Sequence, residues 1–262
     1  MNTSNKHLNL LVHDLIRLGD YSRWMPPKDP ENISWFSNKN GKHTDEILLA
    51  QRLEELAIRG ANLSDFGYAI ANINKPKMLE VAFKYGADPN KSGIRLGSRK
   101  TNNGLSPIER AIYKKRTKIA ETLISHPNFN FRLDTPQGKT NVLFIAVETG
   151  NLTLANKIVK IKPELILEQP EIGSNILLSL SIYLSKGKKL NSKVLTFAKN
   201  CLDYADNNGF HFSINAANQR GQTILSSSQE IATLITEHIF HSLKNSIDNT
   251  NNQTTKTKSI KL

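Results

Sequence analysis

The middle of the chain repeats one spacing of small and large apolar residues. In three segments, a small residue is followed eight positions later by an aliphatic residue and four positions after that by another large apolar residue. A small residue lets a short helix lie close to its neighbour, and an i, i+4 pair gives a second helix one apolar stripe. The spacing therefore predicts a repeated helix-turn-helix unit. The three sets are Ala71, Leu79 and Phe83; Ala111, Ile119 and Leu123; and Ala146, Leu154 and Ile158.

Glycine-containing or polar clusters follow the first two apolar stripes. They are Gly86-Ala-Asp-Pro and His126-Pro-Asn, and residues of these types commonly end helices. One helix-turn-helix unit cannot bury its apolar face alone, whereas stacked units bury it against one another. We therefore expect an all-α stack of repeats.

The flanking segments continue the helical pattern less regularly. The N-terminal side predicts an amphipathic helix over Ser4–Leu18 and a second helix over Thr44–Arg59, which ends at Gly60-Ala-Asn-Leu. Between them, Asp20–Lys42 is a long polar loop. We expect its aromatic residues to cap the exposed end of the stack, and a separate binding patch is the alternative. They are Trp24, Trp35 and Phe36.

The C-terminal third predicts a stretched repeat and a final helix. Helices are expected over Ile176–Leu184 and Ser192–Ala205, with the polar loop Ser185–Asn191 between them. A final helix is expected over Ser228–Leu243. The divisions are a helix and aromatic loop in 1–43, repeats in 44–168, degenerate repeat or capping helices in 169–244, and a disordered tail in 245–262.

Four stretches of the repeats resemble the ankyrin-repeat family. Gly104-Leu-Ser-Pro-Ile-Glu-Arg-Ala111 is similar to the G-x-T-P-L-H-x-A opening of that repeat, with Ser for Thr, Ile for Leu and Glu for His. Gly86-Ala-Asp-Pro-Asn90 resembles its end. Gly138–Ala146 is a poorer copy of the opening with one extra residue, whereas Val147-Glu-Thr-Gly150-Asn-Leu matches the turn between the helices well. The resemblance covers about residues 44–165 and implies an ankyrin-like helix-turn-helix repeat solenoid with irregular capping helices at both ends.

The same resemblance implies a function in protein–protein interaction. In the family, partners contact the finger-like loops between repeats and the first helix of each repeat. We therefore expect a partner-binding surface made of the residues that fall at those positions, together with the basic residues of the long loop 91–103. They are Arg95, Arg99, Lys100, Asn102, Asn103, Leu105, Tyr113, Lys114, Pro136, Gln137, Lys139, Glu148 and Thr149.

The charge distribution indicates what kind of partner such a surface would bind. The formal net charge is +12, and Lys75–Lys118 alone carries 12 basic residues against 3 acidic ones. A local excess of this kind favours a protein partner with an acidic surface. The run Lys114-Lys-Arg-Thr-Lys118 fits a short nuclear-localisation pattern, but we expect solvated charges at a turn. Nonspecific binding to nucleic acid or an anionic surface is an alternative.

Enzyme chemistry has little support in the sequence. Cys201 lies inside an expected helix, and no base stands at a spacing that would activate its thiol. His238 and His241 lack the H-E-x-x-H zinc pattern, and we expect them on an exposed helix face. We expect no metal, no cofactor and no catalytic residue. An enzyme with a site in the C-terminal third, around Cys201 and His211, is the alternative.

The chain also shows features of a bacterial effector. Its degenerate, Asn- and Lys-rich repeats and polar tail resemble ankyrin-repeat effectors that intracellular bacteria deliver into a host. The first 20 residues lack the uninterrupted apolar stretch of a secretory signal peptide, and the apolar runs are too short to span a bilayer. We expect translocation into the host-cell cytosol if the chain is an effector, and a cytoplasmic location otherwise.

Overall fold

Two compact units make up the computed structural model, Met1–Ile145 and Ala146–Leu262. The structure describes residues 3–19, with the side chains of 7–16, and residues 46–64, 66, 71, 75–91, 105–135, 138–171, 173–241 and 244. The predicted aromatic loop Asp20–Lys42 and the predicted disordered tail 245–262 lie outside these residues.

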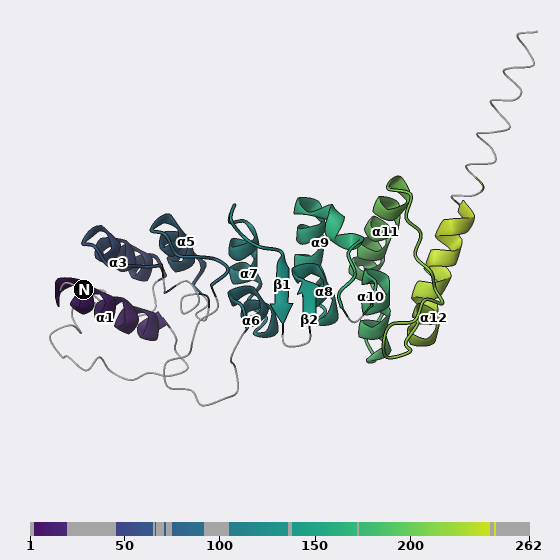
Figure 1. Cartoon of the computed structure of the whole chain (residues 1–262), viewed down its shortest axis with the longest axis horizontal. Helices are drawn as coiled ribbons and strands as arrows, with labels where there is room; N and C mark the ends of the chain where they lie inside the picture. Colours follow the sequence, from purple (N-terminus) through teal and green to yellow (C-terminus); the bar gives the residue numbers. More distant parts are fainter. Residues whose placement is uncertain are drawn as a thin grey trace, which may run out of the picture. The chain divides into compact units, whose positions relative to one another are not determined.

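The first unit consists of short helices that pack against their neighbours, with one β-hairpin. α1 packs against α3, α3 against α5, and α5 against α7, which also packs against α6 (Figure 1). The strands pair antiparallel, with Arg132 opposite Asn141 and Thr135 opposite Gly138. The elements are α1 (Thr3–Gly19), α3 (Glu46–Ile58), α5 (Pro76–Lys84), α6 (Pro107–Tyr113), α7 (Thr117–Ile124), β1 (Arg132–Thr135) and β2 (Gly138–Asn141).

The second unit repeats the paired-helix arrangement. α9 packs against η3 and α11, and α10 packs against α11 and α12. A further helix over residues 229–241 follows α12. Helix α8 begins in the last residues of the first unit. The elements are α8 (Val142–Glu148), α9 (Leu152–Ile161), the 3-10 helix η3 (Pro163–Ile166), α10 (Ile176–Ser185), α11 (Ser192–Asn207) and α12 (Ile224–Ser227).

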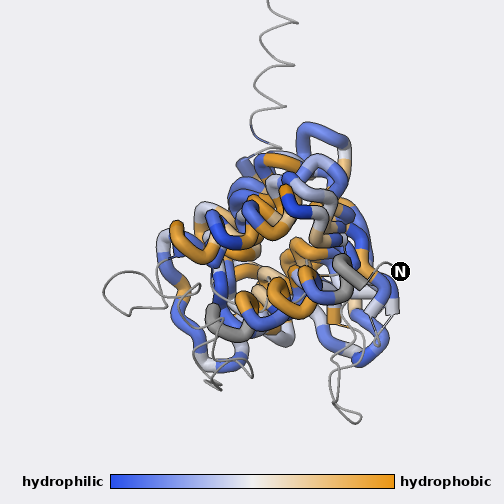
Figure 2. Tube along the Cα trace, turned by 90° about the vertical axis from the view of Figure 1, so that its left-hand side faces the viewer, coloured by the Kyte–Doolittle hydropathy of each residue, from blue (hydrophilic) through white to orange (hydrophobic). Residues whose placement is uncertain are grey.

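The residues that defined the sequence repeat form the core, as the spacing predicted. Ala111, Ile119 and Leu123 are each 0% exposed, and the equivalent residues of the third set are buried as well. Phe83 is the exception, because it is half-buried and its ring lies 4.6 Å from that of His126. Figure 2 shows hydrophobic and hydrophilic positions alternating along the helices.

One capping position explains why the repeat openings tolerate degenerate sequences. The side chain before each first helix accepts a hydrogen bond from a backbone N–H of its first turn, which stabilises the helix start. Ser, Asn and Thr side chains can all accept this hydrogen bond, so the Thr of the family's G-x-T-P-L-H-x-A opening is not required. The donors and acceptors are Glu109 N to Ser106 (3.4 Å), Phe144 N to Asn141 (3.2 Å), Leu178 N to Asn175 (2.8 Å) and Ser226 N to Thr223 (3.0 Å).

Five of the described helices end in the same backbone motif. The N–H of the second residue after the helix donates to the carbonyl three residues back, and the next N–H donates to the carbonyl five residues back. The motif places its central residue at positive φ, a conformation that glycine adopts without a Cβ penalty. Gly60, Gly86, Gly150 and Gly209 occupy this position after α3, α5, α8 and α11. After α6 it is Lys115, at φ 56°, where a non-glycine residue costs about 1 kcal/mol.

The helices expected outside the central repeats are confirmed. The segment Thr44–Arg59 contains α3, and Ser4–Leu18 lies within α1. In the second unit, Ile176–Leu184 corresponds to α10 and Ser192–Ala205 to α11. The predicted final helix over Ser228–Leu243 corresponds to the helix over residues 229–241.

Candidate interaction surface

Helix α6 presents three of the predicted contact residues, at its two ends. Tyr113 is the last residue of the helix, and its side chain is 54% exposed although it is a large aromatic residue. Lys114 is the C-cap and is exposed. Leu105 is half-buried at the opposite end, immediately before the N-cap Ser106. The structure therefore brings Tyr113 and Lys114 together and separates them from Leu105 by the length of the helix.

The hairpin presents Lys139 on its second strand. Lys139 is exposed and lies directly opposite Asp134 of β1 in the strand register. Oppositely charged residues at such a position attract each other across the strands. With the exposed Arg132 on β1, the hairpin carries two basic residues and one acidic residue on the surface of the first unit.

Glu148 and Thr149 end α8 in the second unit, and both are exposed. The Thr149 hydroxyl donates to the carbonyl of Ala146 at 3.2 Å. Desolvation by surrounding protein raises the pKa of the Glu148 carboxyl, although the residue keeps solvent contact, and the positive charges of Lys186 and Arg220 partly oppose that rise. Both cations are therefore close enough to act on Glu148.

Sequence reasoning missed Lys186 and Arg220. Lys186 is the C-cap of α10, the position that Lys114 occupies on α6, so the repeat register could have identified it. Arg220 precedes Gly221 in the loop that leads to α12. Both are exposed. The remaining predicted contact residues lie outside the part of the chain that the structure describes: Arg95, Arg99, Lys100, Asn102, Asn103, Pro136 and Gln137.

Hydrogen bonds between successive loops hold parts of this surface in place. In the first unit, Asn90 Nδ2 donates to the Asn128 carbonyl at 2.8 Å, and Asn130 N donates to Asn90 Oδ1 at 2.7 Å. In the second unit, the buried Asn218 donates from Nδ2 to Ser174 Oγ at 3.1 Å. In the first unit these bonds join the loop after α5 to the loop before β1, and in the second unit they join the loop before α10 to the loop before α12.

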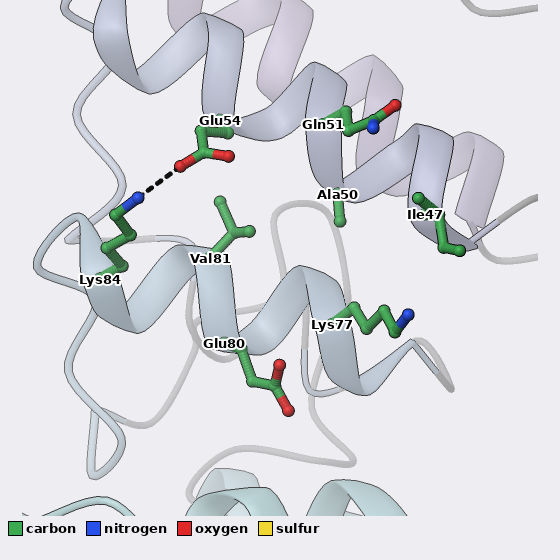
Figure 3. Close-up of a pocket in the computed structure, with 8 residues that line it drawn as sticks. All are labelled: Ile47, Ala50, Gln51, Glu54, Lys77, Glu80, Val81 and Lys84. Carbon is green, nitrogen blue, oxygen red and sulfur yellow. Dashed lines mark hydrogen bonds and ion pairs between the residues drawn. The ribbon is translucent and has the colours of Figure 1, made fainter.

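A shallow groove of about 340 Å³ lies between α3 and α5, and the sequence pattern did not indicate it. Lys84 Nζ lies 2.6 Å from Glu54 Oε1 across one end of it (Figure 3), and this hydrogen bond and charge lower the pKa of Glu54. Glu46 at the start of α3 accepts from Lys77 N at 2.7 Å. The lining residues are Ile47, Ala50, Gln51, Glu54, Lys77, Glu80, Val81 and Lys84.

The residues named for the enzyme alternative do not form a nucleophilic site. Cys201 is 0% exposed, and burial strongly raises the pKa of its thiol, which keeps it protonated. His211 is exposed, and its Nδ1 lies 3.5 Å from Asp206 Oδ1. His238 Nε2 lies 2.8 Å from Asp206 Oδ2. The imidazoles therefore gather at Asp206, and His238 is partly buried there rather than on the exposed face that we expected.

The described ranges contain neither a metal-binding cluster nor a membrane-spanning helix. There, His, Cys, Asp and Glu side chains nowhere form a group of three that could hold a metal ion. In the same residues, every helix is too short or too polar to cross a bilayer.

Comparisons by sequence find neither a family model nor a curated protein that matches the chain. Solved structures do match it. The ankyrin repeat domain of Bcl-3 aligns with a TM-score of 0.50 and 14% identity over 88% of this chain and 94% of that one. The human ASB11 ankyrin repeat domain aligns with a TM-score of 0.50 and 13% identity, over 88% of this chain and 96% of that one. The ankyrin repeat protein EF0377 aligns with a TM-score of 0.52 and 16% identity, over 80% of this chain and 94% of that one.

Proposed function

We propose that this chain, which has the fold of the ankyrin-repeat proteins, is a protein-interaction module whose partner has an acidic surface. The observation that carries the proposal is the exposed pair of Tyr113 and Lys114 on the rigid end of α6. An exposed tyrosine is typical of protein-binding surfaces, where Tyr, Trp and Arg contacts often dominate, and the neighbouring lysine adds charge that steers an acidic partner.

Rigidity and charge support the same proposal. The capping box of α6 and the hydrogen bonds that close its C-terminal turn fix the backbone beneath Tyr113 and Lys114, so binding orders few groups there. The basic excess in Lys75–Lys118 would steer an acidic partner toward the first unit. Under this proposal the predicted loop residues Arg95, Arg99 and Lys100 take part in the encounter.

Replacing Arg95, Arg99 and Lys100 together by Ser is expected to weaken partner capture from host-cell lysate while leaving the melting temperature unchanged. Substitutions in loops seldom change stability by more than about 0.5 kcal/mol. The loss should shrink at high salt, because screening removes the electrostatic steering. Lys160→Gln, an exposed change on α9, is the matched control and should capture normally.

Titration with duplex DNA distinguishes a nucleic-acid binder from a protein binder. If the loop binds phosphates, the same triple variant will lower the slope of log affinity against log salt. Unchanged capture and an unchanged DNA slope would together contradict a role for the basic loop.

We further propose that the chain is a bacterial effector that acts in the host-cell cytosol. The support is its resemblance in composition to degenerate, Asn- and Lys-rich ankyrin-repeat effectors. Deleting residues 247–262 is expected to abolish delivery of a reporter fusion into host cells and to leave the melting temperature unchanged, because this segment has little apolar surface to bury. A truncated fusion that still enters host cells would show that these residues carry no export signal.

A further inference from the structure

The turn between α6 and α7 departs from the other turns at one residue. Lys115 N donates to the Ile112 carbonyl at 2.9 Å, and Arg116 N donates to the Ala111 carbonyl at 2.8 Å. The same two bonds close the turn after α8, where the central residue is Gly150. The backbone motif is therefore intact after α6, and only the residue type differs.

Glycine is the favourable residue for this backbone, because the Cβ of any other residue crowds the adjacent carbonyl at positive φ. Among residues with side chains, Asn and Asp adopt the conformation most readily, whereas Lys has no such advantage. Lys115 is the one non-glycine residue at positive φ in the described part of the chain. A lysine here lowers stability relative to glycine, so the fold itself does not account for its presence.

The surroundings of Lys115 are rich in exposed positive charge. Lys114 and Lys118 are exposed on either side of it, and Arg116 is half-buried between them. The nearest acidic residues in sequence are Glu121 on α7 and the buried Glu109 on α6, both equally far from Lys115. Tyr113 adds its exposed ring at the end of α6. The segment Tyr113–Lys118, which we call the basic turn, thus combines four cations and one aromatic side chain on a hydrogen-bonded backbone.

We propose that the basic turn binds an acidic segment of a protein partner and that Lys115 is a binding residue that contributes its positive charge. The inference rests on the proposed function and specifies one anchor point within it. A carboxylate-rich segment complements four cations held close together. Duplex DNA fits less well, because the turn has no helix positioned to enter a groove and Tyr113 is its one aromatic residue.

The test uses the full chain and a deca-glutamate peptide as the acidic probe, followed by NMR titration and thermal unfolding. Wild-type shift changes should centre on residues 113–118. Lys115→Gly should weaken peptide binding about two- to fivefold, the range for one exposed ion pair, and should raise the melting temperature by about 2 °C or more. Lys115→Arg should bind within about twofold of wild type. Lys160→Gln should match wild type in both measurements.

Several results would overturn the inference. If Lys115→Gly melts at a higher temperature and binds the peptide as well as wild type, the lysine is irrelevant to recognition. Shift changes that spare residues 113–118, or no binding of the peptide by wild type, would place recognition elsewhere. A similar loss of duplex DNA affinity in Lys115→Gly would assign the turn to phosphate. If the peptide results contradict the basic turn but partner capture still depends on Arg95, Arg99 and Lys100, the proposed function stands and only this anchor point is wrong.

Discussion

Replacing Ala111 by Glu is expected to unfold the first unit. Ala111 is 0% exposed in α6, which packs against α7, and its carbonyl accepts the N–H of Arg116 that closes the basic turn. A glutamate there overfills the contact between the helices and buries a charge without a partner. We expect a loss of about 3 kcal/mol or more in the free energy of unfolding. Thermal and urea unfolding followed by circular dichroism measure it.

Tyr113→Glu is the matched control, because it adds the same side chain to the same helix at a position that is 54% exposed. It should change the free energy of unfolding by about 0.5 kcal/mol or less. Equal destabilisation by both variants would mean that the added charge, not the packing of Ala111, is responsible. Wild-type melting of Ala111→Glu would show that the repeat register is wrong.

Glu109 shows under what condition this helix accepts a buried carboxylate. It is 2% exposed, and its Oε2 accepts from Ser106 N at 2.7 Å and from Ser106 Oγ at 2.8 Å. These bonds form the capping box at the start of α6 and compensate for the lost hydration. Ala111 lies past the first turn of α6 and is 0% exposed, so a glutamate there cannot use the capping box at the helix start. The contrast explains why two glutamates two residues apart would have opposite effects.

The core of the repeats was predictable because burial follows spacing. A small residue on one helix and an aliphatic residue eight positions later on the next helix are both buried when the two helices pack together. The burial of Ala111 and Ile119 could therefore be predicted from the sequence alone. The capping residues were partly predictable, since Ser106 matches the family's opening. Asn141 was obscured by the extra residue in Gly138–Ala146, although it caps α8 at the equivalent position.

The surface was less predictable, because its features depend on backbone conformation and on contacts between distant residues. A lysine in a basic run gives no sign of positive φ, so the strain at Lys115 emerges only once the turn's hydrogen bonds are known. One end of the groove between α3 and α5 is crossed by the hydrogen bond between Lys84 and Glu54, which are 30 positions apart in the sequence. Glu148 acquires Lys186 and Arg220 as neighbours in the same way.

Asn218→Ala is expected to destabilise the second unit by about 2–4 kcal/mol. Asn218 is 7% exposed, and its Oδ1 accepts from Arg220 N at 2.9 Å and from Gln222 N at 3.0 Å. Its Nδ2 donates to Ser174 Oγ at 3.1 Å and to Gln222 Oε1 at 3.2 Å. Alanine removes all four bonds and leaves the hydroxyl of Ser174, which is 0% exposed, without this donor. An unsatisfied buried polar group costs about 1–3 kcal/mol by itself.

Asn218→Asp separates the two halves of this network. Aspartate keeps the oxygen that accepts from the two backbone N–H groups and loses the Nδ2 that joins the loop to Ser174. Its free energy of unfolding should therefore fall between those of wild type and Asn218→Ala, measured by urea unfolding of the full chain. Asn208→Ala, at an exposed residue after α11, should stay within about 0.5 kcal/mol of wild type. Unfolding of Asn218→Ala at the same urea concentration as wild type would contradict this prediction. The hydrogen bond between Asn218 and Ser174 would then not be what holds the two loops together.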